Sequence, residues 1–149
     1  MSGDLGAVKR LISADHGLAV VSTVRGDGTV QSSVVNAGVC PHPVSGEPVI
    51  GLVAMSAAVK LANLRARPRA TVAFRAGWEW MAVEGAAELI GPDDPYPGFE
   101  TAGLPQLLRD VFVAAGGTHD DWATYDRVMA EERRTAVFVR PERTYGRVS

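Results

Sequence analysis

Apolar and polar residues near the beginning of the chain follow a pattern that predicts a β-hairpin. Residues 18–24 (LAVVSTV) and 29–35 (TVQSSVV) are both rich in β-branched side chains, which strands favour. The intervening Gly26-Asp27-Gly28 has the composition of a tight turn, because glycine adopts the backbone angles that such turns require. We therefore expect the two runs to pair as antiparallel strands.

The rest of the chain divides into further strands and helices by the period of its apolar residues. Gly85 lies within the longest strand-like run and predicts a bulge or a tight bend. The order of elements does not alternate as βαβ units do, which predicts a mainly β fold: a six-stranded antiparallel split barrel with flanking helices. Strand-like runs cover residues 48–55, 70–74, 78–90 and 136–140, and helical periods cover residues 4–13, 104–115 and 121–134.

Length and composition indicate one globular domain over residues 1–149, with 46% hydrophobic and 21% charged residues. The formal net charge of −2 gives no overall basic field, so nucleic acid is not an expected partner. Arginines nevertheless gather at positions 65–69 and 133–134, which leaves local anion binding open. No run approaches the roughly 20 apolar residues of a membrane span, and the first residues lack the apolar core of a signal peptide. We expect a cytoplasmic protein without a membrane partner.

Few side chains in the sequence indicate chemistry of their own. The one cysteine, Cys40, excludes an intramolecular disulfide, and prolines hold its thiol apart from the His42 imidazole. No second pair of ligands follows, which favours an ordinary loop over a metal site. His16 and His119 suit turn or cap positions, and Asp121 suits a helix N-terminus. Without a nucleotide-binding glycine loop, a nucleophile elbow or paired carboxylates, we expect no metal and no catalytic side chain.

A short basic segment after residues 48–55 carries the clearest candidate binding site. Ser56 is a candidate N-cap, Lys60 lies one turn into the expected helix, and Pro68 ends the segment. Backbone N–H groups at a helix start, with the Ser56 hydroxyl and the Lys60 ammonium, suit a phosphate. A solvated basic connector between two strands is the alternative that the spacing alone leaves open.

Two tryptophans and two polar residues are candidates for contacts to a planar ligand. Trp78 and Trp80 are two residues apart, so on a strand both rings project from the same face. They pack in a core or dimer contact, or they form an aromatic wall beside a planar ligand. On the first hairpin Gln31 and Ser33 also share one face, where their polar groups suit the edge of such a ligand.

Three segments together resemble the split β-barrel flavin and deazaflavin family, which includes pyridoxamine-phosphate-oxidase-like proteins. They are residues 28–35, the motif Lys60-x-x-Asn63-Leu64-Arg65 with the following Pro68-Arg69, and residues 78–89. A closing segment resembles the actinobacterial branch of this family that uses the deazaflavin coenzyme F-420. Its residues include Trp122, Tyr125, Met129, Arg133-Arg134 and Tyr145-Gly146.

The resemblance implies a homodimer of split barrels with a cofactor site in each groove between subunits. It places the cofactor phosphate near Ser56 and Lys60, its ring system against the first hairpin and residues 53–55, and the glutamyl tail of F-420 near Arg133. Because these cofactors perform hydride transfer themselves, the resemblance agrees with the missing catalytic side chains. The implied cofactor-binding residues are Gln31, Ser33, Ala54, Met55, Ser56, Lys60, Asn63, Trp78 and Arg133.

The leading hypothesis is an F-420-dependent reductase that transfers hydride to a small planar or conjugated acceptor. Relatives often carry further arginines around the lysine, where this chain has Ala58 and Ala62. Lys60 alone lacks the bidentate grip of an arginine on phosphate. Either neighbouring donors compensate or the cofactor differs. The alternatives are therefore an FMN-dependent oxidoreductase of the same fold and a non-catalytic protein that binds a cofactor or tetrapyrrole.

Overall fold

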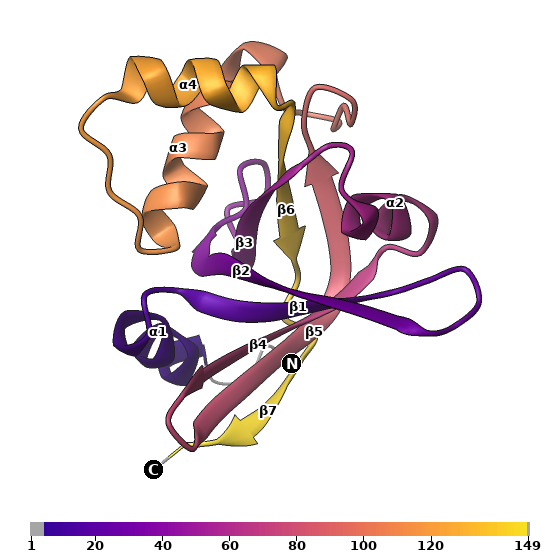
Figure 1. The fold of residues 1–149 in the computed structure, drawn as a ribbon, viewed down its shortest axis with the longest axis vertical. Helices are drawn as coiled ribbons and strands as arrows, with labels where there is room; N and C mark the ends of the chain where they lie inside the picture. The colour runs from indigo at the N-terminus through magenta and orange to yellow at the C-terminus, as the bar shows by residue number, and fades with distance from the viewer. Residues whose placement is uncertain (1–4, 149) are drawn as a thin grey trace.

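Six antiparallel strands form a closed barrel in the computed structural model, which describes residues 5–148 (Figure 1). The strands follow the order β4-β1-β2-β3-β6-β5, and pairing of β4 with β5 closes the ring. The predicted fold, a six-stranded antiparallel barrel with flanking helices, is confirmed. The barrel strands are β1 (Leu18–Val24), β2 (Val30–Pro41), β3 (Pro48–Met55), β4 (Arg69–Ala76), β5 (Glu79–Ile90) and β6 (Arg134–Val139).

Strands β2 and β5 are long and each changes its partner part-way. β2 pairs with β1 through its first half and with β3 through its second. β5 pairs with β4 as far as Ala86 and with β6 from Ala87 onward. The pairing with β4 continues through Gly85, so the predicted bulge is absent at this residue. A Cβ on Gly85 would lie 2.0 Å from the Arg140 carbonyl oxygen, so glycine permits a close crossing of two chain segments.

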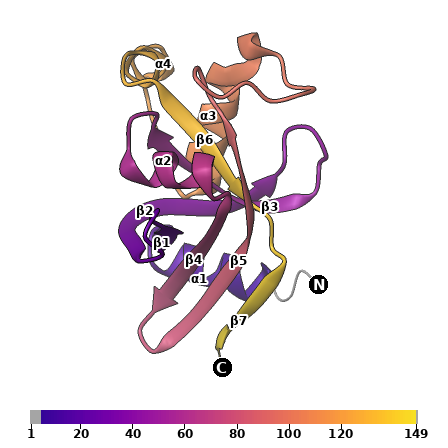
Figure 2. The ribbon, with the colours of Figure 1, turned by 90° about the vertical axis from the view of Figure 1, so that its right-hand side faces the viewer.

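A seventh strand, β7 (Arg143–Arg147), lies outside the ring and pairs with β5 (Figure 2). The last strand-like run predicted from the sequence ends at residue 140, so β7 was not predicted. None of the β7 residues is buried, and the strand forms because β5 offers it free backbone hydrogen-bonding groups. Because β7 has no buried face, its sequence lacks the alternation of apolar and polar residues that predicts a strand.

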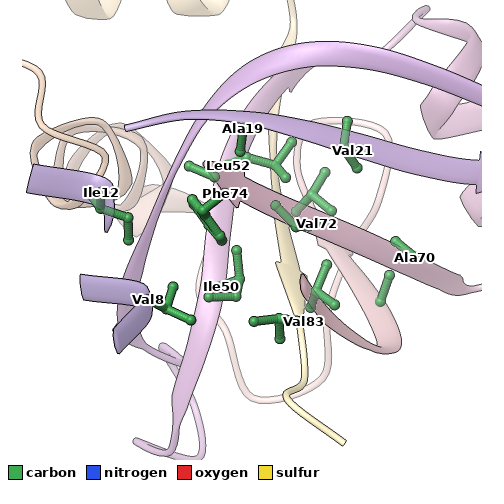
Figure 3. Close-up of a cluster of buried hydrophobic side chains, with 14 of the residues drawn as sticks. Val8, Ile12, Ala19, Val21, Ile50, Leu52, Ala70, Val72, Phe74 and Val83 are labelled. Carbon is green, nitrogen blue, oxygen red and sulfur yellow. The ribbon is translucent and has the colours of Figure 1, made fainter. Parts of the chain in front are cut away.

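The barrel core is apolar and α1 (Leu5–Ala14) packs against it. Figure 3 shows Val8 and Ile12 of α1 pointing toward barrel side chains that include Ile50, Leu52 and Phe74. The helix matches the predicted residues 4–13 to within one residue, and position 4 lies outside the described residues. No helix among residues 5–148 is long and apolar enough to cross a membrane.

The remaining helices surround the opposite part of the barrel. α2 (Val59–Ala66) connects β3 to β4, whereas α3 (Leu104–Ala114) follows the 3-10 turn η1 (Thr101–Gly103) and precedes α4 (Trp122–Glu131). α3 contacts β2, β3 and β6, and α4 lies beside α3 (Figures 1 and 2). The cap interpretation of Asp121 is confirmed, because its carboxylate accepts a bond of 3.1 Å from the Thr124 backbone N–H.

Cys40 and His42 lie in different surroundings. Cys40 belongs to the apolar cluster beneath α3, and burial raises the pKa of its thiol to about 11. His42 is buried in the β2–β3 loop, where its Nδ1 accepts bonds from the backbone N–H of Val44 (3.1 Å) and Ser45 (3.3 Å). Its Nε2 lies 3.2 Å from a carboxylate oxygen of Glu88. His42 therefore lies in a loop, as the sequence favoured, whereas Cys40 lies on strand β2 rather than in the loop.

Candidate functional site

A cavity of about 610 Å³ lies between the barrel and the α3–α4 pair. Strands β2 and β3 supply one wall, including Val34 and Ala54, and helices α3 and α4 supply another. Lys60 from α2 and Arg134 from the start of β6 bring positive charge to it. Among the residues that the structure describes, none with a carboxylate lines this cavity. Its electrostatic character therefore suits an anionic ligand.

Lys60 is the central cation of the cavity. Its Nζ donates a hydrogen bond to the Ser33 hydroxyl at 3.3 Å, and within residues 5–148 it forms no ion pair. Burial, followed by the nearby charge of Arg134, lowers the pKa of Lys60 below its ordinary value of 10.5. Both effects disfavour the ammonium form, and an anion bound beside it would favour that form.

Arg134 is the second cation, and the sequence analysis did not select it. Its guanidinium forms an ion pair of 2.9 Å with Glu132, two residues earlier. Arg134 is paired with Met55 across β6 and β3, so the cation stands beside residues that line the cavity. The sequence showed two adjacent arginines, but their local backbone decides which of them faces the cavity.

The apolar wall opposite the strands comes from α3 and α4. Phe112 and Tyr125 have ring centroids 5.1 Å apart, and Met129 lies one turn beyond Tyr125 on the same face of α4. The Tyr125 hydroxyl donates to the Leu108 carbonyl oxygen at 3.1 Å, so only the ring is available to a ligand. The i, i+4 spacing of Tyr125 and Met129 was visible in the sequence, but not which surface they cover.

An ion pair fastens the two helices of this wall. Arg109 of α3 donates two bonds to the Asp126 carboxylate of α4, at 2.9 and 2.5 Å. The same guanidinium lies 5.2 Å from the centre of the Trp122 ring, within the range of cation–π attraction. The wall is therefore held by a bidentate contact as well as by apolar packing.

The structure corrects the predicted N-cap of α2. The N-cap is Ala58, and the helix begins at Val59 rather than directly after Ser56. The buried Ser56 hydroxyl instead donates to Asp93 at 2.6 Å and accepts a bond from Arg65 at 3.0 Å. Ser56 is not among the residues that line the cavity.

Arg133 is also used elsewhere. Its guanidinium binds both carboxylate oxygens of Asp93, and its backbone is in the left-handed region with φ of +49°. It does not line the cavity, whereas the next residue, Arg134, does. Ser56 and Arg133 are thus brought together by Asp93, outside the cavity that Lys60 lines.

Gln31 and Asn63 meet in a second group of polar contacts. The buried Asn63 donates to the Thr23 hydroxyl at 3.1 Å, and that hydroxyl donates to the Gln31 side-chain oxygen at 3.3 Å. This chain of bonds ties α2 to the first hairpin. Asn63 and Gln31 do not line the cavity themselves, but they hold the two elements that carry Lys60 and Ser33.

Trp78 does not lie on a strand, contrary to the prediction. Gly77 and Trp78 form the two-residue turn between β4 and β5, where Gly77 has φ of +63° and Trp78 is 94% exposed. Trp80 lies on β5, with its ring edge-to-face against Tyr145 at 6.1 Å. A separate surface hollow at this hairpin contains both tryptophans. Within one copy of the chain, therefore, neither tryptophan ring lines the cavity that contains Lys60.

Of the other expected residues, Ala54 and Met55 do line the cavity, and Met55 is 43% exposed. Ala58 lines it too, whereas Ala62 is exposed on α2 and lies outside its lining. Three of the expected residues, Ala54, Met55 and Lys60, therefore line the same cavity. Ser33 accepts a hydrogen bond from Lys60. Of the two positions where relatives often carry arginine, only position 58 therefore belongs to the cavity wall.

Several solved structures have a fold similar to that of this chain. An F-420 reductase aligns with a TM-score of 0.61 and 18% identity over 92% of this chain and 94% of that one. The chain has the split-barrel fold. A pyridoxamine 5′-phosphate oxidase-related, FMN-binding protein from Nostoc punctiforme aligns with a TM-score of 0.65 and 12% identity over 95% of this chain and 80% of its own.

A heme binding protein from Mycobacterium smegmatis also shares the fold, with a TM-score of 0.60 and 16% identity over 95% of this chain and 53% of its own. These structural similarities, at such low sequence identity, show a common fold, and the predicted resemblance is confirmed at the level of the fold. No protein-family model matches the sequence, and no curated protein matches it either.

Proposed function

We propose that the protein is a reductase that binds coenzyme F-420 in the cavity and transfers a hydride to a small planar or conjugated acceptor. The observation that carries the proposal is the placement of Lys60 and Arg134 in a cavity whose helical wall is apolar and aromatic. Cationic side chains suit the phosphate and the glutamyl carboxylates of F-420, and the apolar wall suits a flat ring system. The similarity in fold to an F-420 reductase, over nearly the full length of both chains, supports the proposal.

The residues present fit such a cofactor. Lys60 and Arg134 would hold its anionic groups, and the backbone and small side chains near Ala54 would support its rings. When bound, the deazaflavin would supply the hydride. The chain would bind and orient cofactor and acceptor and exclude water from the cavity, which requires no acidic or basic catalytic side chain.

FMN has the same two features, a phosphate and a planar ring system, and it is the alternative cofactor. Haem is less well suited to the cavity. Haem iron in proteins is held by histidine, cysteine, methionine or tyrosine. Among the described residues, no histidine or cysteine lines the cavity, and the hydroxyl of Tyr125 is bonded to Leu108. Among the described lining residues, the thioethers of Met55 and Met129 would be left to hold the iron.

We further propose that two copies of the chain form the working unit. The outward face of the first hairpin exposes five apolar side chains, and Val34 belongs both to this face and to the cavity lining. The pair Ser22–Ser32 interrupts these apolar side chains on the face, and a concentration of exposed apolar residues of this kind marks an interaction site. A second copy on this face would cover part of the cavity opening. The five residues are Leu18, Val20, Val24, Val30 and Val34.

A titration of the purified protein with F-420, FMN and haem tests the proposed cofactor. We expect F-420 to bind with at least tenfold lower Kd than FMN or haem, and its absorbance to change on turnover with quinone and enone acceptors. Tight FMN binding without an F-420 response would identify an FMN-dependent oxidoreductase instead. Retention of haem without turnover of any acceptor would identify a binding protein.

A further inference from the structure

Asp93 lies at the centre of a group of polar contacts just outside the cavity. It follows β5 in a tight turn in which Gly91 and Asp94 exchange backbone bonds. Its carboxylate accepts a bond of 2.6 Å from the Ser56 hydroxyl and binds the Arg133 guanidinium with both oxygens. We name Ser56, Asp93 and Arg133, with the neighbouring pair Arg65–Asp94, the Asp93 cluster.

The Asp93 cluster joins the two segments that carry the cavity cations. The Ser56 backbone N–H donates to the Arg133 carbonyl oxygen at 3.0 Å. Arg65 of α2 binds both carboxylate oxygens of Asp94, at 2.9 and 2.7 Å, and donates to the Ser56 carbonyl oxygen at 3.0 Å. α2 and the start of β6 are therefore tied to the same short turn. Bidentate arginine–carboxylate contacts within a network fix geometry better than isolated surface pairs do.

The backbone of Arg133 has the left-handed conformation, with φ of +49°. A residue other than glycine in the left-handed region, as here, is held there by its surroundings, because the conformation costs energy. Asp93 supplies such a hold through the guanidinium. The turn at Arg133 directs its own side chain to Asp93, and the next side chain, Arg134, lines the cavity.

We propose that Asp93 is a positioning residue, which holds Ser56 and Arg133 and so orients Lys60 and Arg134 toward one anionic group of the cofactor. This inference rests on the proposed function. It explains why two expected cofactor donors, Ser56 at the phosphate and Arg133 at the glutamyl tail, are engaged with Asp93 in the structure. Their role is indirect, through the two cations that remain in the cavity.

The test compares two ligands on the Asp93→Asn variant: F-420, and the same deazaflavin nucleus lacking phosphate and glutamates. We expect the Kd for F-420 to rise about tenfold and the Kd for the uncharged nucleus to change less than twofold. A merely structural loss would weaken both ligands alike. Glu142→Gln is the matched control, because it removes another arginine–carboxylate pair, with Arg69, away from the cavity lining.

A pH profile supplies a second readout. If Asp93→Asn lets Arg134 withdraw, the repulsion on Lys60 is released, and the loss of F-420 binding at alkaline pH moves to higher pH. Ser56→Ala is the milder variant should Asp93→Asn fold poorly. It removes the hydroxyl's bonds to Asp93 and from Arg65 but leaves the Arg65–Asp94 and Arg133–Asp93 ion pairs, so a smaller selective loss is expected.

The outcomes separate the two proposals. Unchanged F-420 affinity in both variants, or equal weakening of both ligands, overturns the role of Asp93 while the cofactor assignment stands. Wild-type protein that binds the uncharged nucleus as tightly as F-420 overturns the anionic site and the role of Asp93 with it.

Discussion

Lys60 is a half-buried cation that lies near a second cation, Arg134. Its ammonium donates a hydrogen bond to the neutral hydroxyl of Ser33. A half-buried ammonium beside a second cation has a lowered pKa, as Lys60 has. An anionic ligand would relieve both the burial and the repulsion from Arg134. Lys60 should therefore be more costly to the apo protein than to the complex.

We predict that F-420 affinity declines with rising pH before the ordinary lysine value of 10.5 is reached. The folded-state pKa of Lys60 is lowered, so the ammonium that attracts the anion is lost earlier than in a free lysine. Fluorescence titrations of F-420 between neutral and alkaline pH will measure the decline. Lys60→Arg is the control, because a guanidinium keeps its charge throughout this range. A pH profile identical in wild type and Lys60→Arg would contradict the prediction.

We predict that Lys60→Met weakens F-420 binding at neutral pH by about ten- to a hundredfold, the usual value of a hydrogen bond to a charged group. Methionine has similar length and no charge, so packing is largely kept. Isothermal titration of the variant and of Lys9→Met, which changes an exposed lysine on α1, measures the difference. Equal affinities of both variants would remove Lys60 from the site.

Cys40 illustrates how strongly burial controls a single side chain. Its pKa of about 11 leaves almost no thiolate at neutral pH. We predict that a thiol reagent such as DTNB does not modify the native protein at pH 8 and reacts with one equivalent after denaturation. Absorbance at both stages gives the count. Rapid reaction of the native protein would show that the cluster beneath α3 opens readily.

At the residue scale, the position of Lys60 after a strand and at a helix start selected it from the sequence, and the family resemblance added Ala54 and Met55; all three line the cavity. It could not foresee that Ser56 turns to Asp93, since the partner is 37 positions away in the sequence. The choice between two adjacent arginines depended on a left-handed backbone at one of them. Local sequence patterns show which types of side chain an element carries, whereas the direction in which each side chain points depends on tertiary contacts.

At the scale of elements, α3 depends on one glycine of the barrel. A Cβ on Gly38 of β2 would lie 2.1 Å from the carbonyl oxygen of Ala114, so the last turn of the helix rests directly on the strand backbone. α3 also supplies Val111 and Phe112 to the cavity, and its C-cap residue Ala115 lines the cavity too. The wall of the cavity is therefore set by how closely one helix end approaches one strand.

We predict that Gly38→Ala destabilises the protein by about 1–3 kcal/mol, because the helix must move away from the strand. Urea denaturation measures the free energy of unfolding. Gly26→Ala is the matched control: its Cβ would meet nothing within 4 Å, and it should change stability by less than about 0.5 kcal/mol. Equal stability of the two variants would mean that α3 shifts without cost.

Most elements were predictable from sequence because their apolar periods report on a single buried face. β3 spans the predicted residues 48–55, and α3 and α4 match within a few residues. β7 was missed because its residues are not buried. The start of α2 was misplaced because Ser56, two residues before the true N-cap Ala58, resembled an N-cap, although its hydroxyl bonds to the carboxylate of Asp93.

At the scale of the whole molecule, the exposed apolar face of the first hairpin is the main feature that one copy leaves unexplained. Val20 and Val34 are directly opposite each other on β1 and β2, and both are more than 40% exposed. Cross-strand valines without a covering layer are costly in water. A second copy of the chain on this face would cover them and the adjoining cavity edge.

We predict that Val34→Lys converts a dimer into a monomer, because a buried lysine without a partner opposes association. Sedimentation velocity on wild type and variant measures the change. Val44→Lys is the control, since Val44 is also exposed but lies in the β2–β3 loop, away from this face. A wild type that sediments as a monomer at micromolar concentration would refute the proposed dimer.

The position of β6 in the ring has a consequence for how the protein is made. β6 pairs with β3 on one side and β5 on the other, with Ile50 opposite Val139 and Met55 opposite Arg134. During synthesis, the hairpins β1–β2 and β4–β5 can form early from neighbouring residues, but the ring stays open until residue 139 leaves the ribosome. Pairings between such distant residues form slowly. The nascent chain therefore exposes the edges of β3 and β5 from their own synthesis until β6 is made, and a chaperone that shields those edges would protect it from aggregation.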